Sequence, residues 1–299
     1  MQPYLAPYAP LNAYVAPARS RAELWRTLCG LLIAGIFGFL SVQAILVSLM
    51  ASLGPERARS TVLGIATGST PQGVTALLFC YVPLMAGLAL GLGLMMRRGL
   101  GSLIGPLAAS ARNFLWVALP LCALWVALMP LSMMAGNVAP NLTLLQQAPW
   151  LPFVLIGLVV QTGTEELLFR GYLQQQLAAR FAARWVWMGV PALLFGLAHY
   201  STQQYGYMAI LVVLFSALFG LAAADLTART GNLGAAVGLH FANNVSAVLL
   251  VGLKGNFGGM ALYNATVDPS DIAGALTFLA IDAVALVVSW LAARLILRV

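Results

Sequence analysis

Long apolar segments separated by short polar connections run along almost the whole chain. Several of these segments reach 18 residues or more, the length that a helix needs to cross a bilayer. The pattern predicts apolar helices at residues 24–51, 72–96, 110–135, 150–178, 185–202, 206–228, 232–253 and 271–297. Strands of a membrane barrel would instead alternate in polarity over segments of about ten residues, a pattern that does not appear. We therefore expect an all-α polytopic membrane protein with about eight transmembrane helices and an intramembrane polar cavity.

Two parts of the chain depart from this regular pattern. The segment at 185–202 is short and contains Pro191, so it is expected to kink or to enter the membrane without crossing it. Residues 1–22 are rich in Pro, Ala and Tyr, which predicts a disordered or surface-lying N-terminal tail. Residues 23–299 are then a single transmembrane domain, and the first apolar run is too long and too late for a cleavable signal peptide.

The composition excludes a soluble protein of this length. The chain is 61% hydrophobic and 8% charged, whereas soluble domains carry about 25% charged residues. Its net charge of +7 is attributed to membrane topology and not to nucleic-acid binding, because Lys and Arg gather in cytoplasmic loops. The expected location is therefore the cell (inner) membrane, with the lipid bilayer as a partner.

The positive charges lie mostly on one side of the predicted spans. The side of the N-terminus holds Arg19, Arg21, Arg26, Arg97, Arg98, Arg112, Arg180, Arg184, Arg229, Arg294 and Arg298. The opposite side holds only Arg57, Arg59 and Lys254, and Arg170 lies within a span. This asymmetry predicts an even number of spans with both termini in the cytoplasm.

Ionisable residues away from the ends of the apolar helices are few. They are Glu165, Glu166, Arg170, His199, His240 and Asp282. Because a charged group at the centre of a membrane helix costs about 2.5–3.5 kcal/mol on insertion scales, each is a candidate functional residue. Two adjacent acids, as in "TEELLFRGYL", are the hardest to explain as packing residues.

Helical phase separates the roles of the two glutamates. Glu166 and Arg170 are four residues apart with the acid first, which favours an internal ion pair. Glu165 is turned by about 100° from Glu166, so it is left free for chemistry. His240 and Asn244 are also four residues apart and present an imidazole and a carboxamide on one face, with Asn243 close to it.

An acid, two imidazoles and an amide that meet in a wet pocket favour hydrolysis, since a carboxylate activates water and the other groups stabilise an oxyanion. Structural roles remain open for each group. A membrane histidine is often only a hydrogen-bonding residue, and a Glu–Arg pair is often structural. We expect Asp282 to have a structural partner, and Asp225 with Arg229 to lie on a solvated face.

Three motifs occur in order on separate helices: "EELLFR" fits E-E-x-x-x-R, "FGLAH" fits F-x-x-x-H, and "HFANN" fits H-x-x-x-N. Together they resemble the CPBP family, which comprises CAAX proteases and bacteriocin-processing enzymes of the type II prenyl endopeptidase kind. The resemblance covers about residues 150–250. It implies a multi-pass intramembrane endopeptidase that acts on a membrane-embedded or lipidated protein or peptide.

The resemblance also implies a role for each residue. Glu165 is the general base for water, His199 shares that water, and His240 with Asn244 forms the oxyanion hole. Glu166 and Arg170 support the site. Glu165, His199 and His240 could instead hold zinc, but the motif H-E-x-x-H is absent, so a metal-independent glutamate protease without a cofactor is favoured.

Two other classes of function compete with the protease. The same polar residues could only bind, in a non-catalytic immunity or scaffold factor of the same family. A proton-coupled transporter also uses buried Glu, His and Arg, but the chain lacks the repeats and paired broken helices of that class. Retained hydrolysis of a peptide bond separates the first function from the other two.

Overall fold

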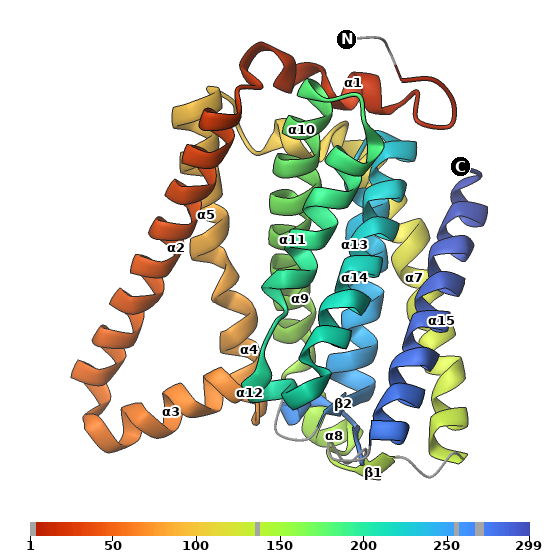
Figure 1. The fold of residues 1–299 in the computed structure, drawn as a ribbon. Helices are drawn as coiled ribbons and strands as arrows, with labels where there is room; N and C mark the ends of the chain where they lie inside the picture. The colour runs from red at the N-terminus through yellow and green to blue at the C-terminus, as the bar shows by residue number, and fades with distance from the viewer. Residues whose placement is uncertain (1–3, 135–137, 254–256, 267–271) are drawn as a thin grey trace.

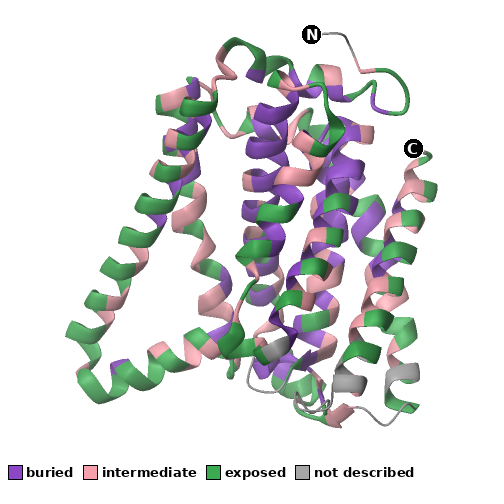
Figure 2. Cartoon of the chain, viewed as in Figure 1, coloured by how far each residue is buried: buried purple, intermediate pink, exposed green. Residues whose placement is uncertain are grey.

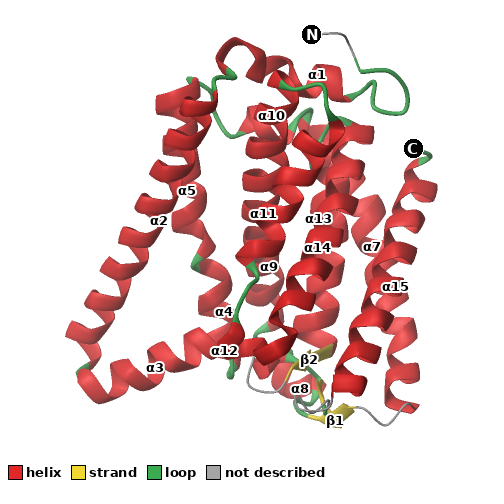
Figure 3. Cartoon of the chain, in the orientation of Figure 1, coloured by secondary structure: helices red, strands yellow, loops and turns green. Residues whose placement is uncertain are grey.

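A computed structural model describes residues 4–134, 138–253, 257–266 and 272–299 of the chain. Within these ranges, six helices are long and apolar enough to cross a membrane: Leu24–Leu53, Pro71–Met96, Leu107–Pro130, Leu151–Arg180, Ala209–Thr230 and Leu279–Leu297. Two shorter apolar helices, Trp185–Ala198 and Gly234–Leu250, complete the bundle. Figure 3 shows that helices form almost the whole molecule. The all-α polytopic class predicted from the sequence is confirmed.

Several of these helices are interrupted, and the labels in Figure 1 follow their parts. The first membrane helix is α2 (Leu24–Leu53), and the second combines α4 (Pro71–Phe79), α5 (Tyr81–Gly91) and a π-helical turn at Leu92–Met96. The other helices of the bundle include α7 (Leu107–Met134), α9 (Leu151–Glu166) with α10 (Gln174–Arg180), α13 (Ala209–Thr230), the shorter α14 (Gly234–Val245) and α15 (Ile272–Leu297). Short helices lie at α6 (Gly101–Ile104), α8 (Leu144–Gln147) and α12 (Thr202–Tyr205).

The helix predicted at 185–202 is shorter than expected. It consists of a π-helical turn at Trp185–Gly189 and α11 (Val190–Ala198), with Pro191 in the first turn of α11. Fourteen residues of helix rise about 21 Å, less than the ~30 Å of a hydrocarbon core. The segment therefore ends inside the bundle, and His199 lies at its C-terminal cap.

Glycines allow α2 and α5 to pack closely. A Cβ atom at Gly91 of α5 would collide with the carbonyl oxygen of Gly30 in α2, and one at Gly87 would lie 2.7 Å from the carbonyl oxygen of Ala34. At the other end the two helices diverge and are bridged by α3 (Pro55–Thr67) (Figure 1). The apolar pattern predicts only a connection at residues 52–71, although Pro55 in the first turn and Gly68 in the left-handed conformation are helix boundary signals.

Residues 4–21 of the N-terminal segment have a defined structure. It forms α1 (Leu11–Val15) and a 3₁₀ helix at Ala16–Arg21, and the side chains of Tyr8, Leu11, Tyr14 and Val15 are buried. In Figure 1 it lies across one end of the bundle. The expected disordered or surface-lying tail is therefore packed onto the bundle, because its aromatic and aliphatic side chains reach apolar surface that the helices leave open there.

A small three-stranded sheet lies at the opposite end of the bundle (Figure 1). Its strands are β1 (Val138–Pro140), β3 (Tyr263–Ala265) and β2 (Val251–Leu253), in that order, with β1 antiparallel and β2 parallel to β3. Strands of three residues carry no recognisable apolar alternation, so the sequence pattern does not predict them. Lys254, which the charge count placed at this end, is outside the described residues.

The centre of the molecule is formed by α9, α10, α13 and α14. Half of the most apolar window of the α9–α10 helix is buried, against 17% for α2. Figure 2 shows this difference: buried residues fill the middle helices, and exposed ones cover α2 and α15. Exposed side chains on α2, such as Leu32 and Phe39, are large and apolar, as expected for a surface that faces lipid. The polar residues of α9 therefore lie in the protein interior.

Candidate active site

The helix that carries both glutamates changes its geometry beside them. The α-helix α9 ends at Glu166, and Leu167–Leu173 form a π-helical stretch before α10 begins. Such wide turns inside α-helices are frequent at functional sites. Glu165 and Glu166 lie near the middle of this 30-residue helix, so their carboxylates are far from both ends of the bundle.

Glu166 and Arg170 form a buried ion pair, as their spacing predicted. Nη1 of Arg170 lies 2.9 Å from Oε1 of Glu166, and neither side chain is exposed. The guanidinium also stacks on the ring of Phe195, with its carbon 4.4 Å from the ring centroid. Both contacts stabilise a charge that would otherwise be costly in the interior.

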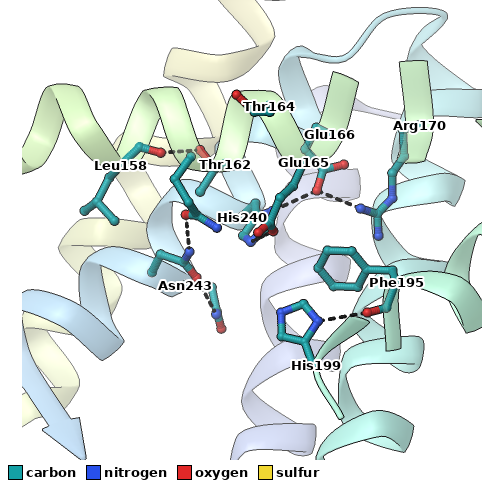
Figure 4. Close-up of polar contacts among 12 residues, drawn as sticks. Leu158, Thr162, Thr164, Glu165, Glu166, Arg170, Phe195, His199, His240 and Asn243 are labelled. Atoms are coloured by element: carbon teal, nitrogen blue, oxygen red, sulfur yellow. Dashed lines mark hydrogen bonds and ion pairs between the residues drawn. The ribbon is translucent and has the colours of Figure 1, made fainter. Parts of the chain in front are cut away.

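His240 on α14 joins the two glutamates. Its Nδ1 is 2.8 Å from Oε1 of Glu166, and its Nε2 is 3.5 Å from Oε2 of Glu165. Because a carboxylate only accepts hydrogen bonds, each ring nitrogen that faces one is placed to donate, Nδ1 to Glu166 and Nε2 toward Glu165. The ring of Phe219 packs against this imidazole at 4.8 Å. Figure 4 shows the imidazole and both carboxylates in one cluster.

A second polar contact links α9 and α14 one turn away. Nδ2 of Asn244 donates to Oε1 of Gln161 at 2.8 Å, and Oδ1 of Asn244 accepts from Nδ2 of Asn243 at 3.2 Å. Asn244 thus lies on the face of α14 that carries His240, as the i, i+4 spacing predicted. Asn243, which the sequence left open, contacts Asn244 and not the glutamates.

His199 stands apart from the carboxylates. Its Nδ1 interacts with the carbonyl oxygen of Phe195 at 2.8 Å, and its ring packs on that of Phe195 with centroids 4.6 Å apart. Phe195 also contacts the imidazole of His240, at 5.8 Å. Figure 4 shows His199 below the Glu165 cluster. The structure therefore brings Glu165, Glu166, Arg170, His240 and Asn244 together, and places His199 beside them through Phe195.

The three residues named as zinc ligands do not form a ligand set. Among the residues that the structure describes, no group of three or more His, Cys, Asp or Glu side chains is arranged to hold a metal ion. His199 is turned to the Phe195 carbonyl, while Glu166, the acid closest to His240, is paired with Arg170. The donors of this site thus fit zinc poorly.

Several buried atoms of the cluster remain available to water or substrate. Within the described part of the chain, Oε2 of Glu165, Oε2 of Glu166, and Nε and Nη2 of Arg170 have no hydrogen-bond partner. Buried polar atoms in proteins almost always have one, often a water molecule. The cluster is therefore a polar interior, as expected, whereas the open cavity stays a prediction.

The two other acids considered in the sequence have different environments. Asp225 is buried and not solvated: Nε of Arg229 donates to both of its oxygens at 2.8 and 2.9 Å, and the hydroxyl of Tyr8 donates at 2.7 Å. Trp290 on α15 donates to it at 3.0 Å. The expectation of a solvated face was wrong, because the N-terminal segment covers this end of α13. Asp282 is half-buried on α15, and its structural partner stays a prediction.

Sequence reasoning missed three features of the site. It gave Glu166 a single partner, whereas His240 is a second one. It did not consider Gln161, although this residue lies one turn before Glu165 in an apolar helix. It also missed Tyr81 of α5, an electrostatic neighbour of both Glu165 and Gln161. Only the position of Gln161 inside an apolar run was a signal that could have found it.

One family of known proteins matches the part of the chain that contains this site. Residues 147–246 match the family model described as type II CAAX prenyl endopeptidase Rce1-like. No curated protein and no solved structure matches the chain. The matched range contains Glu165, His199 and His240, and it confirms the resemblance to the CAAX protease family that the three motifs indicated. Over this range the polytopic membrane protein is similar to CAAX-type intramembrane proteases, and the Rce1-like region carries its buried polar cluster.

Proposed function

We propose that the protein is an endopeptidase that hydrolyses peptide bonds of a membrane-associated or lipidated protein or peptide, with water activated by Glu165. The observation that carries this proposal is the contact of His240 with both carboxylates of the doublet, deep in the bundle. A purely structural ion pair needs only Glu166 and Arg170. The second acid, with an imidazole nitrogen facing it, is what hydrolysis requires.

The proposed reaction assigns one role to each group. Glu165 accepts a proton from water while His199 holds that water, and the resulting hydroxide attacks the carbonyl carbon of the substrate. The oxyanion accepts hydrogen bonds from Nε2 of His240 and Nδ2 of Asn244. Glu165 then gives its proton to the leaving amine, which breaks the C–N bond and restores the carboxylate.

Glu166 and Arg170 support this reaction without touching the substrate. Glu166 accepts from Nδ1 of His240, which orients the ring so that Nε2 points to the oxyanion. Arg170 holds the Glu166 carboxylate in place and balances its charge. The proposed mechanism uses no metal ion, in keeping with the poor fit of the donors to zinc.

The test is cleavage of a farnesylated reporter peptide by the purified protein in detergent or nanodiscs. We expect the wild type to cleave with or without a chelator, and Glu165→Gln to be folded but slower by about 100- to 10,000-fold, the usual contribution of a general base. Loss of activity under chelator that zinc restores would overturn the metal-independent mechanism. If Glu165→Gln and wild type bind the peptide equally and neither cleaves it, the immunity or scaffold function replaces the protease.

A further inference from the structure

Two polar contacts connect α9 and α14 in matching register. Gln161 and Glu165 are one turn apart on α9, and Asn244 and His240 are one turn apart on α14. Glu165 faces His240 at 3.5 Å, and Gln161 faces Asn244 at 2.8 Å. The two helices run in opposite directions (Figure 1). The i, i+4 pair on α9 therefore faces the i, i+4 pair on α14 and forms two contacts that are one helical turn apart. The first contact holds the proposed base, and the second holds the proposed oxyanion donor.

The Asn244 carboxamide is fixed at both ends by these contacts. Its nitrogen donates to Oε1 of Gln161, and its oxygen accepts from Asn243. An amide nitrogen has two hydrogens, so one remains free after the bond to Gln161. If the amide rotated by 180°, a carbonyl oxygen would face the developing oxyanion and repel it. The bond to Gln161 therefore selects the orientation that presents an N–H.

The environment of Gln161 is unfavourable for an amide without such a role. Its side chain is only 7% exposed, in a helix whose preceding residues, Leu158 to Val160, are apolar. Burying an amide without hydrogen bonds costs several kcal/mol by transfer data, whereas an aliphatic residue of the same size would pack at no such cost. Gln161 is also an electrostatic neighbour of Tyr81, which interacts with Glu165 as well.

We propose that Gln161 is a positioning residue of the reaction, which acts by holding the Asn244 amide with its nitrogen toward the substrate carbonyl. This inference rests on the proposed function, because it needs Asn244 as an oxyanion donor. It assigns to Gln161 no contact with the substrate. Its effect therefore has to vanish when Asn244 is removed.

The experiment is a double-mutant cycle on the purified full chain with the farnesylated reporter peptide. Gln161→Met keeps the length of the side chain and removes the amide. We expect it to lower kcat about tenfold with KM within twofold of wild type, a smaller loss than the 100- to 1,000-fold that removal of a whole oxyanion donor causes. In the Asn244→Ala background, Gln161→Met should change kcat by less than twofold, because the two residues act as one unit.

Gln147→Met is the matched control. Gln147 is also buried, and its amide nitrogen donates to the carbonyl oxygens of Leu249 and Met260 at 2.9 and 2.8 Å, at the sheet end of the bundle. We expect this variant to lower the melting temperature and to leave kcat near the wild-type value. Gln161→Met should show the reverse pattern.

Other outcomes of the cycle would contradict the positioning role of Gln161 or the proposed function. Equal losses of kcat from Gln161→Met in both backgrounds, or no loss in either, would overturn the positioning role. If Gln161→Met does not fold, Gln161→Leu takes its place, and failure of both to fold makes Gln161 a structural residue. The proposed function fails separately, namely if Glu165→Gln and Asn244→Ala cleave the reporter as fast as the wild type does.

Discussion

At the scale of single residues, the two adjacent glutamates differ through their partners. Glu166 is fully buried, and its Oε1 binds both Arg170 and His240. Glu165 forms a longer contact, 3.5 Å, with Nε2 of His240 and lies beside Tyr81. The difference follows from helical phase: successive residues are turned by about 100° about the helix axis, so Glu166 points at Arg170 and Glu165 points to a different side of the helix. Two residues of identical chemistry therefore have different environments, and their separate roles stay a prediction.

Glu166→Gln is expected to destabilise the protein and to lower its activity. The substitution leaves Arg170 as an unpaired charge in the interior, and breaking a buried pair costs about 3–5 kcal/mol. It also weakens the bond that orients His240. Adding Arg170→Met should restore much of the melting temperature and yield without restoring cleavage. A double variant as unstable as Glu166→Gln would contradict this account, as would a stable and fully active single variant.

At the scale of elements, the packing of α2 against α5 depends on close contact between their backbones. Gly91 faces the carbonyl oxygen of Gly30, whereas Gly35 on the outer face of α2 has no heavy atom within 4 Å of an added Cβ. Small residues at helix crossings are typical of membrane bundles, where close packing replaces the hydrophobic effect between helices. Gly91, at the helix crossing, and Gly35, on the outer face, can therefore be compared as test and control positions.

Gly91→Ala is expected to cost about 1–3 kcal/mol of stability, because a methyl group has to separate two backbones. Gly35→Ala should be neutral or gain about 0.5–1 kcal/mol from its higher helix propensity. Melting temperatures of the two variants in the same detergent measure the difference. Equal effects of the two substitutions would show that α2 and α5 do not depend on this crossing.

The N-terminal segment is tied to the bundle by phenol groups. The hydroxyl of Tyr4 donates to the carbonyl oxygens of Ala178 and Phe181 at 2.8 and 3.1 Å, and that of Tyr8 donates to Asp225. Burial raises the pKa of Tyr4 to about 12, and Arg19 opposes this shift. Burial, followed by the bond to Asp225, also raises the pKa of Tyr8.

These shifts predict a loss of stability at alkaline pH. A raised pKa in the folded state means that folding favours the neutral phenol. The stability that the neutral phenols contribute is fully present below the unfolded pKa of about 10. It is lost as the pH rises through the folded pKa of Tyr4, about 12. We expect the melting temperature of the wild type to fall between pH 9.5 and 11.5, in the range set by these pKa values. The double variant Tyr4→Phe, Tyr8→Phe should have a lower melting temperature than the wild type at pH 8, and its melting temperature should fall less between pH 9.5 and 11.5. An equal fall in both proteins would show that the phenols do not cause it.

At the scale of the whole molecule, the two termini lie at the same end of the bundle (Figure 1). The N-terminal segment and the last turn of α15 mark this end, and α3 with Arg57 and Arg59 lies at the other. The arginine asymmetry predicts that the end with the termini faces the cytoplasm. The side of the membrane stays a prediction that fusion reporters can test.

A reporter that is active only in the cytoplasm should be active when fused after Val299, and a reporter that is active only outside should be active when inserted at Ser69, between α3 and α4. The reason is that Arg-rich ends are retained on the cytoplasmic side. The measurement is reporter activity normalised to protein level. Outside activity after Val299 would contradict the predicted topology.

The sequence by itself determined the membrane class, nearly all the helices and the Glu166–Arg170 pair, because length of an apolar run and i, i+4 spacing are local properties of the chain. It also indicated which polar residues had to be explained, since each was costly in an apolar helix. Only the tertiary structure decided which of them meet. The contacts of Glu166 with His240 and of Gln161 with Asn244 join residues 74 and 83 positions apart, and their register depends on how two helices pack. The burial of the N-terminal segment was decided in the same way, by a surface that exists only after the bundle has formed.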